Sequence, residues 1–134
     1  MKAKEIKTKN VTILLLRPGI IENIIHDYAT LEKEDILEIK QINKQLAGGM
    51  PYVVLIDSGS FTDINKEARE LLSSREFGEN TIAKALFVRS LGHRIVAQFY
   101  IRINKPYIKT KIFADREKAI DWLDNELKNN RDSL

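Results

Sequence analysis

The chain has 134 residues, of which 43% are hydrophobic and 31% are charged, and its 22 Lys and Arg against 19 Asp and Glu give a net charge of +3. This composition is typical of one folded domain and excludes a disordered chain. No apolar run approaches the roughly 18 residues that a transmembrane helix needs. The absence of cysteine excludes disulfides, thiolate catalysis and cysteine zinc sites. Because residues 1–7 lack the apolar block of a secretory signal, we expect a cytoplasmic protein.

The first predicted element is a β-hairpin. A β-branched run at residues 11–16 ends at Arg17-Pro18-Gly19, where proline fixes φ and glycine supplies a positive φ for the turn. The second strand is expected at residues 20–25. The isoleucine spacing there also fits a helix, and periodicity alone leaves both alternatives open.

Helices and strands alternate after the hairpin. Thr30 is the expected N-cap of a helix with an apolar stripe from Ile36 to Leu46, which ends at Gly48-Gly49. The continuous apolar run at residues 52–56 is typical of a strand covered on both faces. The remaining predicted elements are a polar loop at 57–62, a helix around 68–72, a strand at 83–88, a helix at 91–103, a strand at 108–113 and a helix capped by Asp115.

Two of the later helices carry apolar side chains with a clear arrangement. Leu91, Ile95, Phe99 and Ile103 form one stripe on the helix at 91–103, and Trp122 on the last helix is expected in the core. The order ββ-α-β-α-β-α-β-α predicts an α/β fold with a mixed, mostly parallel sheet and about four helices. We expect one domain over residues 1–134, with a core at about 11–127 and short polar ends.

Several segments carry a resemblance to a known group of proteins. They are Val54-Leu55-Ile56-Asp57, Lys66-Glu67-Ala68-Arg69, Ala85-Leu86-Phe87-Val88, Asn104-Lys105-Pro106, Thr110-Lys111, Phe113 and Ala119-Ile120-Asp121-Trp122-Leu123. With these segments the chain resembles small bacterial STAS-like proteins, which have an anti-sigma-factor-antagonist-like fold and are similar to the Sec-fourteen (CRAL-TRIO) lipid-binding group. The resemblance implies a STAS-like fold and a non-catalytic domain.

A loop in the middle of the chain is a candidate regulatory site. Anti-sigma-factor antagonists switch partners when a serine is phosphorylated in an Asp-Ser-Ser-Gly motif that opens the helix after the third strand. The corresponding stretch here, Asp63-Ile64-Asn65-Lys66, has no hydroxyl group. The preceding residues offer a shifted interaction or phosphorylation loop, and the alternative is that they are turn and cap residues. These residues are Asp57, Ser58, Ser60 and Thr62.

Positive charge is concentrated in one part of the chain. Residues 80–114 contain seven Lys or Arg and no Asp or Glu. A basic surface there would attract anionic lipid headgroups or an acidic protein, and the alternative is an ordinary solvated surface. Nucleic acid is disfavoured because few aromatic residues are expected to be exposed among these cations. The candidate basic patch consists of Arg94, Arg102, Lys105, Lys109 and Lys111.

Catalytic and metal-binding patterns are absent from the sequence. His26 and His93 follow different elements and belong to no metal-spaced cluster, and no serine has the glycine flanks of a nucleophile elbow. Gly48-Gly49 lacks the spacing of a phosphate-binding loop. The sequence therefore predicts no enzyme activity, cofactor or metal.

Two functions remain as hypotheses. The first is a non-enzymatic STAS-like regulatory or protein-interaction module with an unidentified protein partner. The second is a protein that binds a lipid or other small apolar ligand and associates with anionic membrane surfaces through the basic patch. The sequence leaves homodimerisation open.

Overall fold

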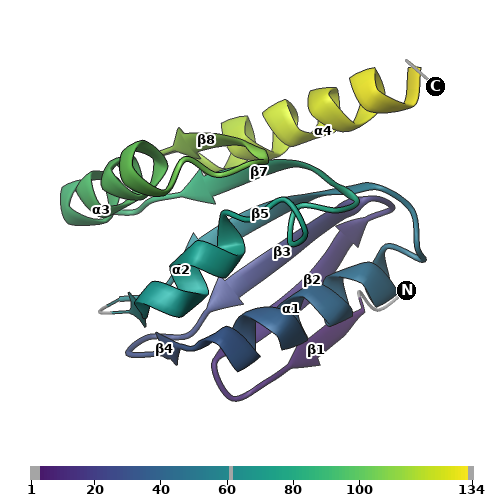
Figure 1. Ribbon diagram of the computed structural model, residues 1–134. Coiled ribbons are helices and arrows are strands. Elements are labelled where there is room, and N and C mark those ends of the chain that lie inside the picture. The colour runs from purple at the N-terminus through teal and green to yellow at the C-terminus, as the bar shows by residue number, and fades with distance from the viewer. Residues whose placement is uncertain (1–3, 61, 133–134) are drawn as a thin grey trace.

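The computed structural model describes residues 4–60 and 62–132, so residues 1–3, residue 61 of the polar loop and the last two residues lie outside the description. A six-stranded sheet has the order β1-β2-β3-β5-β7-β8 (Figure 1). The first three strands pair antiparallel and β3, β5, β7 and β8 pair parallel, which confirms the predicted mixed, mostly parallel α/β fold. The strands are β1 (Glu5–Lys7), β2 (Val11–Arg17), β3 (Ile20–Ile25), β5 (Tyr52–Ser58), β7 (Thr81–Phe87) and β8 (Lys109–Phe113).

The hairpin between β2 and β3 settles the alternative at residues 20–25 in favour of a strand. Gly19 has a φ of +84° in the turn, a conformation that glycine adopts without strain. A Cβ atom there would lie 2.8 Å from a methyl group of Leu127, so the turn also packs closely against the last helix.

Helices cover both faces of the sheet (Figure 1). Helices α1 (Lys33–Leu46) and α2 (Lys66–Leu72) lie on one face, and α4 (Arg116–Asp132) lies on the other. Side chains alternate along β5, so that Val54 joins the core under α1 while Val53 and Leu55 pack under α4. The continuous apolar sequence of β5 is explained by this two-sided burial.

The start of α1 differs from the prediction. Thr30 does not cap the helix, because it pairs with Asp63 in a two-stranded parallel sheet formed by β4 (Thr30–Leu31) and β6 (Asp63–Ile64). The N-cap is Glu32, whose backbone N–H donates to the Asp35 carboxylate at 2.8 Å. By contrast, Asp115 accepts a hydrogen bond from the Lys118 backbone N–H at 3.1 Å and caps α4 as predicted.

Helix α3 (Leu91–Asn104) contacts β8, yet none of its residues is fully buried. The apolar stripe faces solvent: Leu91, Ile95, Phe99 and Ile103 are 58–73% exposed. The sequence shows which side of α3 is apolar but does not show whether another element covers that side. Within the described residues, no helix is both long and apolar enough to cross a membrane.

Candidate functional site

A partly open cavity of about 780 Å³ lies between α3 and the sheet face that α1 and α2 cover. Its walls are largely apolar and include Val54 of β5, Leu86 of β7 and Leu72 of α2. On α3 the wall contains the small residues Gly92 and Ala97. The same helix also lines the cavity with larger side chains, among them Tyr100, whereas its exposed apolar stripe does not contribute to the wall. The cavity volume falls within the range of about 300–1,000 Å³ that small-molecule sites occupy.

Lys84 brings an amine to the wall of this cavity. It lies in β7 between Ala83 and Ala85, which pack under α4, so its side chain points to the opposite, cavity-lining face. Lys84 is only 3% exposed, and its Nζ lies 5.7 Å from the centre of the Phe77 ring. Burial, with a further contribution from the charge of Lys40, lowers the pKa of Lys84 to about 8. Its Nζ has no hydrogen-bond or ion-pair partner among the residues that the structure describes.

Lys40 of α1 approaches the same aromatic ring, with its Nζ 5.2 Å from the centre of Phe77. Unlike Lys84, it is well coordinated: its Nζ donates to the Tyr52 hydroxyl at 3.1 Å, the Glu79 carbonyl at 2.6 Å and the Thr81 hydroxyl at 2.9 Å. Burial lowers the pKa of Lys40 to about 8, the charge of Lys44 lowers it further and the charge of Glu79 opposes the shift. Two amines therefore face the Phe77 ring, and of the two only Lys84 lines the cavity.

Several other polar groups around the cavity are paired with one another or with the backbone. Asn23 and Asn43 exchange hydrogen bonds through their side-chain amides at 2.9 and 3.2 Å. Ser73 donates to the Tyr100 hydroxyl at 3.2 Å, and burial raises the pKa of Tyr100. His93 of α3 differs, because its buried Nδ1 has no hydrogen-bond partner among the described residues.

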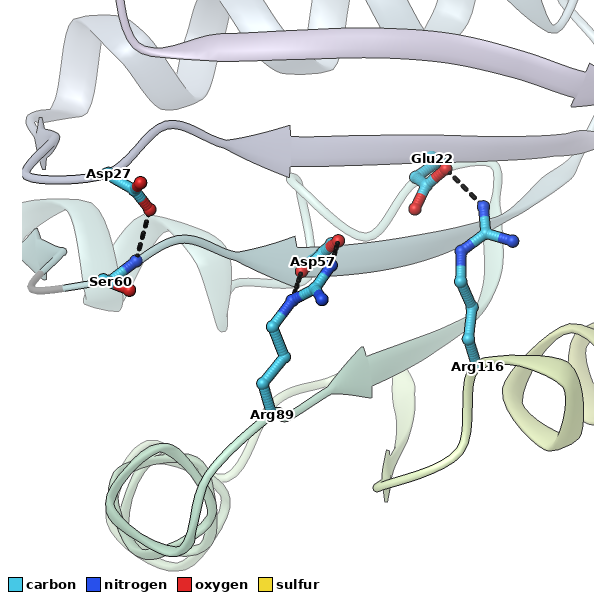
Figure 2. A network of polar contacts seen from close by, with 6 residues as sticks. All are labelled: Glu22, Asp27, Asp57, Ser60, Arg89 and Arg116. Carbon is cyan, nitrogen blue, oxygen red and sulfur yellow. Dashed lines mark hydrogen bonds and ion pairs between the residues drawn. The ribbon is translucent and has the colours of Figure 1, made fainter.

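Two arginines bind buried carboxylates of neighbouring parallel strands, one on β3 and one on β5 (Figure 2). Arg89 holds the buried Asp57 carboxylate through two hydrogen bonds, from Nε at 3.2 Å and from Nη2 at 2.7 Å. Arg116, the first residue of α4, donates to the buried Glu22 carboxylate at 2.7 Å. Each buried carboxylate therefore has a guanidinium partner: one pair joins β5 to the segment after β7, and the other joins β3 to α4.

The network also fixes the loop after β5. The Asp27 carboxylate accepts a hydrogen bond from the Ser60 backbone N–H at 2.7 Å, a contact that Figure 2 shows. Both ring nitrogens of His26 are hydrogen-bonded nearby. Its Nδ1 donates to the Lys9 carbonyl at 3.0 Å, and its Nε2 accepts from the Thr12 hydroxyl at 2.7 Å. No group of three or more His, Cys, Asp or Glu within residues 4–60 and 62–132 is arranged to hold a metal ion.

Comparison with known proteins places this chain in a family. The model of the domain of unknown function DUF7793 matches residues 14–127. The chain belongs to this family. Among curated protein sequences, none matches.

A solved structure from Shewanella loihica PV-4 is similar in fold. It is described as an uncharacterised protein from the DUF3478 family with a SpoIIAA-like fold. The TM-score is 0.52 at 15% sequence identity, and the alignment covers 91% of this chain and 92% of the other. The fold is therefore SpoIIAA-like, and the STAS-like fold predicted from the sequence is confirmed.

The predicted loop residues lie at the rim of the cavity. Ser58, Ser60 and Thr62 all line it, whereas Asp57 points into the Arg89 network on the other side of β5. The Thr62 hydroxyl lies 3.5 Å from the Gly59 carbonyl, as expected for a turn residue. These positions are compatible with both the capping and the phosphorylation hypotheses.

The five predicted basic residues fall into two groups. Arg94, Arg102 and Lys105 are exposed on or just after α3, where Lys105 ends the helix with a φ of +47°. Lys109 and Lys111 lie on β8 and point towards α4. Lys109 forms an ion pair of 2.8 Å with Glu126, and both lysines approach the Trp122 ring within about 6 Å. The cations available to a partner of α3 are therefore those of the first group.

Lys84 is a site residue that the sequence pattern alone does not single out, since it is one of the seven basic residues of 80–114. A signal was present in the sequence, since Lys84 stands in the middle of the apolar run Ile82–Leu86 of a strand that helices cover. A strand buried on both faces leaves no solvent-facing position for a charge. The interior location of Lys84 was therefore predictable, but its position on a cavity wall was not.

Proposed function

We propose that this protein binds a lipid-like ligand with an apolar body in the cavity beneath α3. The observation that carries the proposal is the cavity itself, about 780 Å³ in volume and lined mainly by apolar side chains. A well-packed domain of this size leaves few voids larger than a water molecule. The cavity is also bordered by a lysine and by an unpaired histidine nitrogen. A large space with an apolar wall and a few polar groups has the features of a ligand site.

The outer surface of α3 supports the same proposal. Its exposed apolar side chains are Leu91, Ile95, Phe99 and Ile103, together with Val96, which also lines the cavity. Arg94 and Arg102 flank them on the same helix. Helices that combine an exposed apolar face with Arg or Lys lie in the headgroup region of anionic membranes. Contact of α3 with such a membrane would bring the cavity close to a source of lipid.

The cavity is tested by filling it. Ala97 lines the cavity, whereas the neighbouring Gln98 is exposed. We expect Ala97→Phe to bind neither a polarity-sensitive fluorophore nor single-chain amphiphiles, and Gln98→Phe to bind both as the wild type does. Equal binding by both variants, or no binding of any amphiphile by the wild-type protein, would contradict the proposal.

The membrane surface is tested by flotation with liposomes. The wild-type protein should float with vesicles that contain phosphatidylglycerol and less so with neutral vesicles, and salt should weaken the association. The double variant Ile95→Ser/Phe99→Ser should stay at the bottom of the gradient. Leu37→Ser is the matched control, because Leu37 is an exposed apolar residue on α1. Flotation of the double variant at the wild-type level would exclude α3 as the contact surface.

A second candidate function is a regulatory or protein-interaction module. The exposed apolar face of α3 supports it, because contiguous apolar patches on a protein surface often mark interaction sites. Affinity capture with wild-type protein and with Ile95→Ser/Phe99→Ser tests it: a stoichiometric partner that the variant loses is the expected result. Neither candidate assigns a reaction to the protein.

A further inference from the structure

The chemistry of the ligand follows from the unpaired ammonium group of Lys84. An ammonium group presents three donors, and those of Lys84 meet no acceptor among the described residues. Burying a charge without a partner is unfavourable. The Phe77 ring, 5.7 Å from Nζ, compensates for only part of the lost hydration. The amine is therefore free to pair with an anion that enters the cavity.

Lys40 does not compete for this role, although it faces the same ring. Its three donors are already used by the Tyr52 hydroxyl, the Glu79 carbonyl and the Thr81 hydroxyl. Its charge instead adds positive potential near Lys84 and, after burial, contributes to the lowered pKa of that amine. The pair thus consists of one saturated amine and one free amine.

The other titratable groups on the cavity wall supply no anion to Lys84. Arg89 is bound to Asp57, and Arg69 donates to the Ile64 carbonyl at 2.7 Å. The titratable side chains that line the cavity besides Lys84 are Tyr52, Asp63, Arg69, Arg89, His93 and Tyr100. Asp63 is the one carboxylate among them, and it is an exposed residue of β6 that the structure does not pair with Lys84.

We propose that the cavity takes a single-chain amphiphile with a carboxylate headgroup, and that this carboxylate pairs with Lys84 while the chain lies along the apolar wall. This inference rests on the proposed function. A monoanion matches one free ammonium group, whereas a phosphate dianion would be expected to need a cluster of guanidinium and backbone donors. The apolar wall then accounts for the remainder of the ligand.

The experiment compares dodecanoic acid with dodecanol at pH 7, using delipidated full-length protein and displacement of a polarity-sensitive fluorophore. The wild-type protein should bind the acid at least tenfold more tightly than the alcohol. Lys84→Met should remove this preference and keep the affinity for the alcohol. Lys118→Met, a change at an exposed lysine of α4, should keep the preference.

The possible results separate the inference from the function on which it rests. Equal affinity of the wild-type protein for acid and alcohol would overturn the role of Lys84 but support an apolar ligand site. Failure of both ligands to bind would overturn the proposed function and the inference together. If Lys84→Met does not fold, the wild-type protein still provides a test by NMR titration of the Lys84 side chain. Dodecanoic acid should raise the pKa of this amine, and an unchanged titration would overturn the proposal.

Discussion

Replacement of Lys84 by methionine is expected to stabilise the protein at neutral pH. Methionine is flexible, apolar and similar in length, so it fills the same space without a charge. Burial lowers the pKa of Lys84 from its ordinary value of 10.5 to about 8, a difference of about 2.5. At about 1.4 kcal/mol for each unit, the buried charge destabilises the fold by on the order of 3 kcal/mol. The Lys84→Met protein should therefore be more stable by up to about this amount at pH 7.

The sign of the pH dependence provides a second check on the same substitution. Below pH 8 the lysine is charged in both the folded and the unfolded chain, so the full destabilisation is present. Between pH 8 and 10.5 the unfolded chain binds more protons than the folded one, and the stability of the wild-type protein rises with pH. The gap between wild type and variant should close by about 1.4 kcal/mol per pH unit in this window.

Urea unfolding of wild type, Lys84→Met and Lys118→Met at several pH values measures these differences. Comparing the proteins at each pH cancels the contributions of the titrating groups that do not interact with Lys84, whereas Lys40 is coupled to it. Lys118→Met removes one exposed lysine and should stay within about 0.5 kcal/mol of the wild type throughout. The reasoning is refuted if Lys84→Met is no more stable than wild type at pH 7, or if the gap is the same at pH 7 and pH 10.

Three further predictions address the network, the last helix and the ligand. Arg89→Met should destabilise the fold by about 3 kcal/mol, because it leaves the Asp57 carboxylate, whose side chain is only 8% exposed, without a partner. Asp57→Asn should cost only about 1–2 kcal/mol, because the Arg89 side chain is 60% exposed and regains water. Equal losses of stability in urea unfolding would contradict the assigned burial. Trp122→Ala should lower stability by up to about 3 kcal/mol, since the indole is partly buried against Phe113 with ring centres 5.5 Å apart. If the variant unfolded at the same temperature as the wild type, that packing would be excluded. The pKa of Lys84 in the free protein is about 8, and above this pH the affinity for dodecanoic acid should fall by up to about tenfold per pH unit, because binding favours the charged amine. An affinity that stays constant from pH 7 to 10 in the displacement assay would contradict the pairing.

The strand and helix pattern was largely predictable because the signals are local. The hairpin turn at Gly19, the cap at Asp115 and the two-sided burial of β5 each depend on a few adjacent residues. The strands β1, β4 and β6 were missed, since segments of three and two residues carry no usable periodicity. Thr30 was misassigned as a cap because its partner, Asp63, lies in a distant segment.

The candidate site was less predictable because it depends on packing between elements. Hydrophobic periodicity correctly separates Leu91 and Phe99 from the polar side of α3, but it contains no information on which side meets the sheet. A cavity arises from what the neighbouring helices fail to fill. The pairing of Asp57 with Arg89 likewise joins residues 32 positions apart, and no local pattern indicates it.

The most direct test of the account is to locate a bound apolar chain in solution. Isotope-filtered NMR of delipidated protein with dodecanoic acid reports which methyl groups contact the ligand. The account predicts contacts from the chain to Val54 and Leu86, which line the cavity. Contacts confined to the exposed side chains Leu91 and Ile95, with none to the cavity methyl groups, would contradict it.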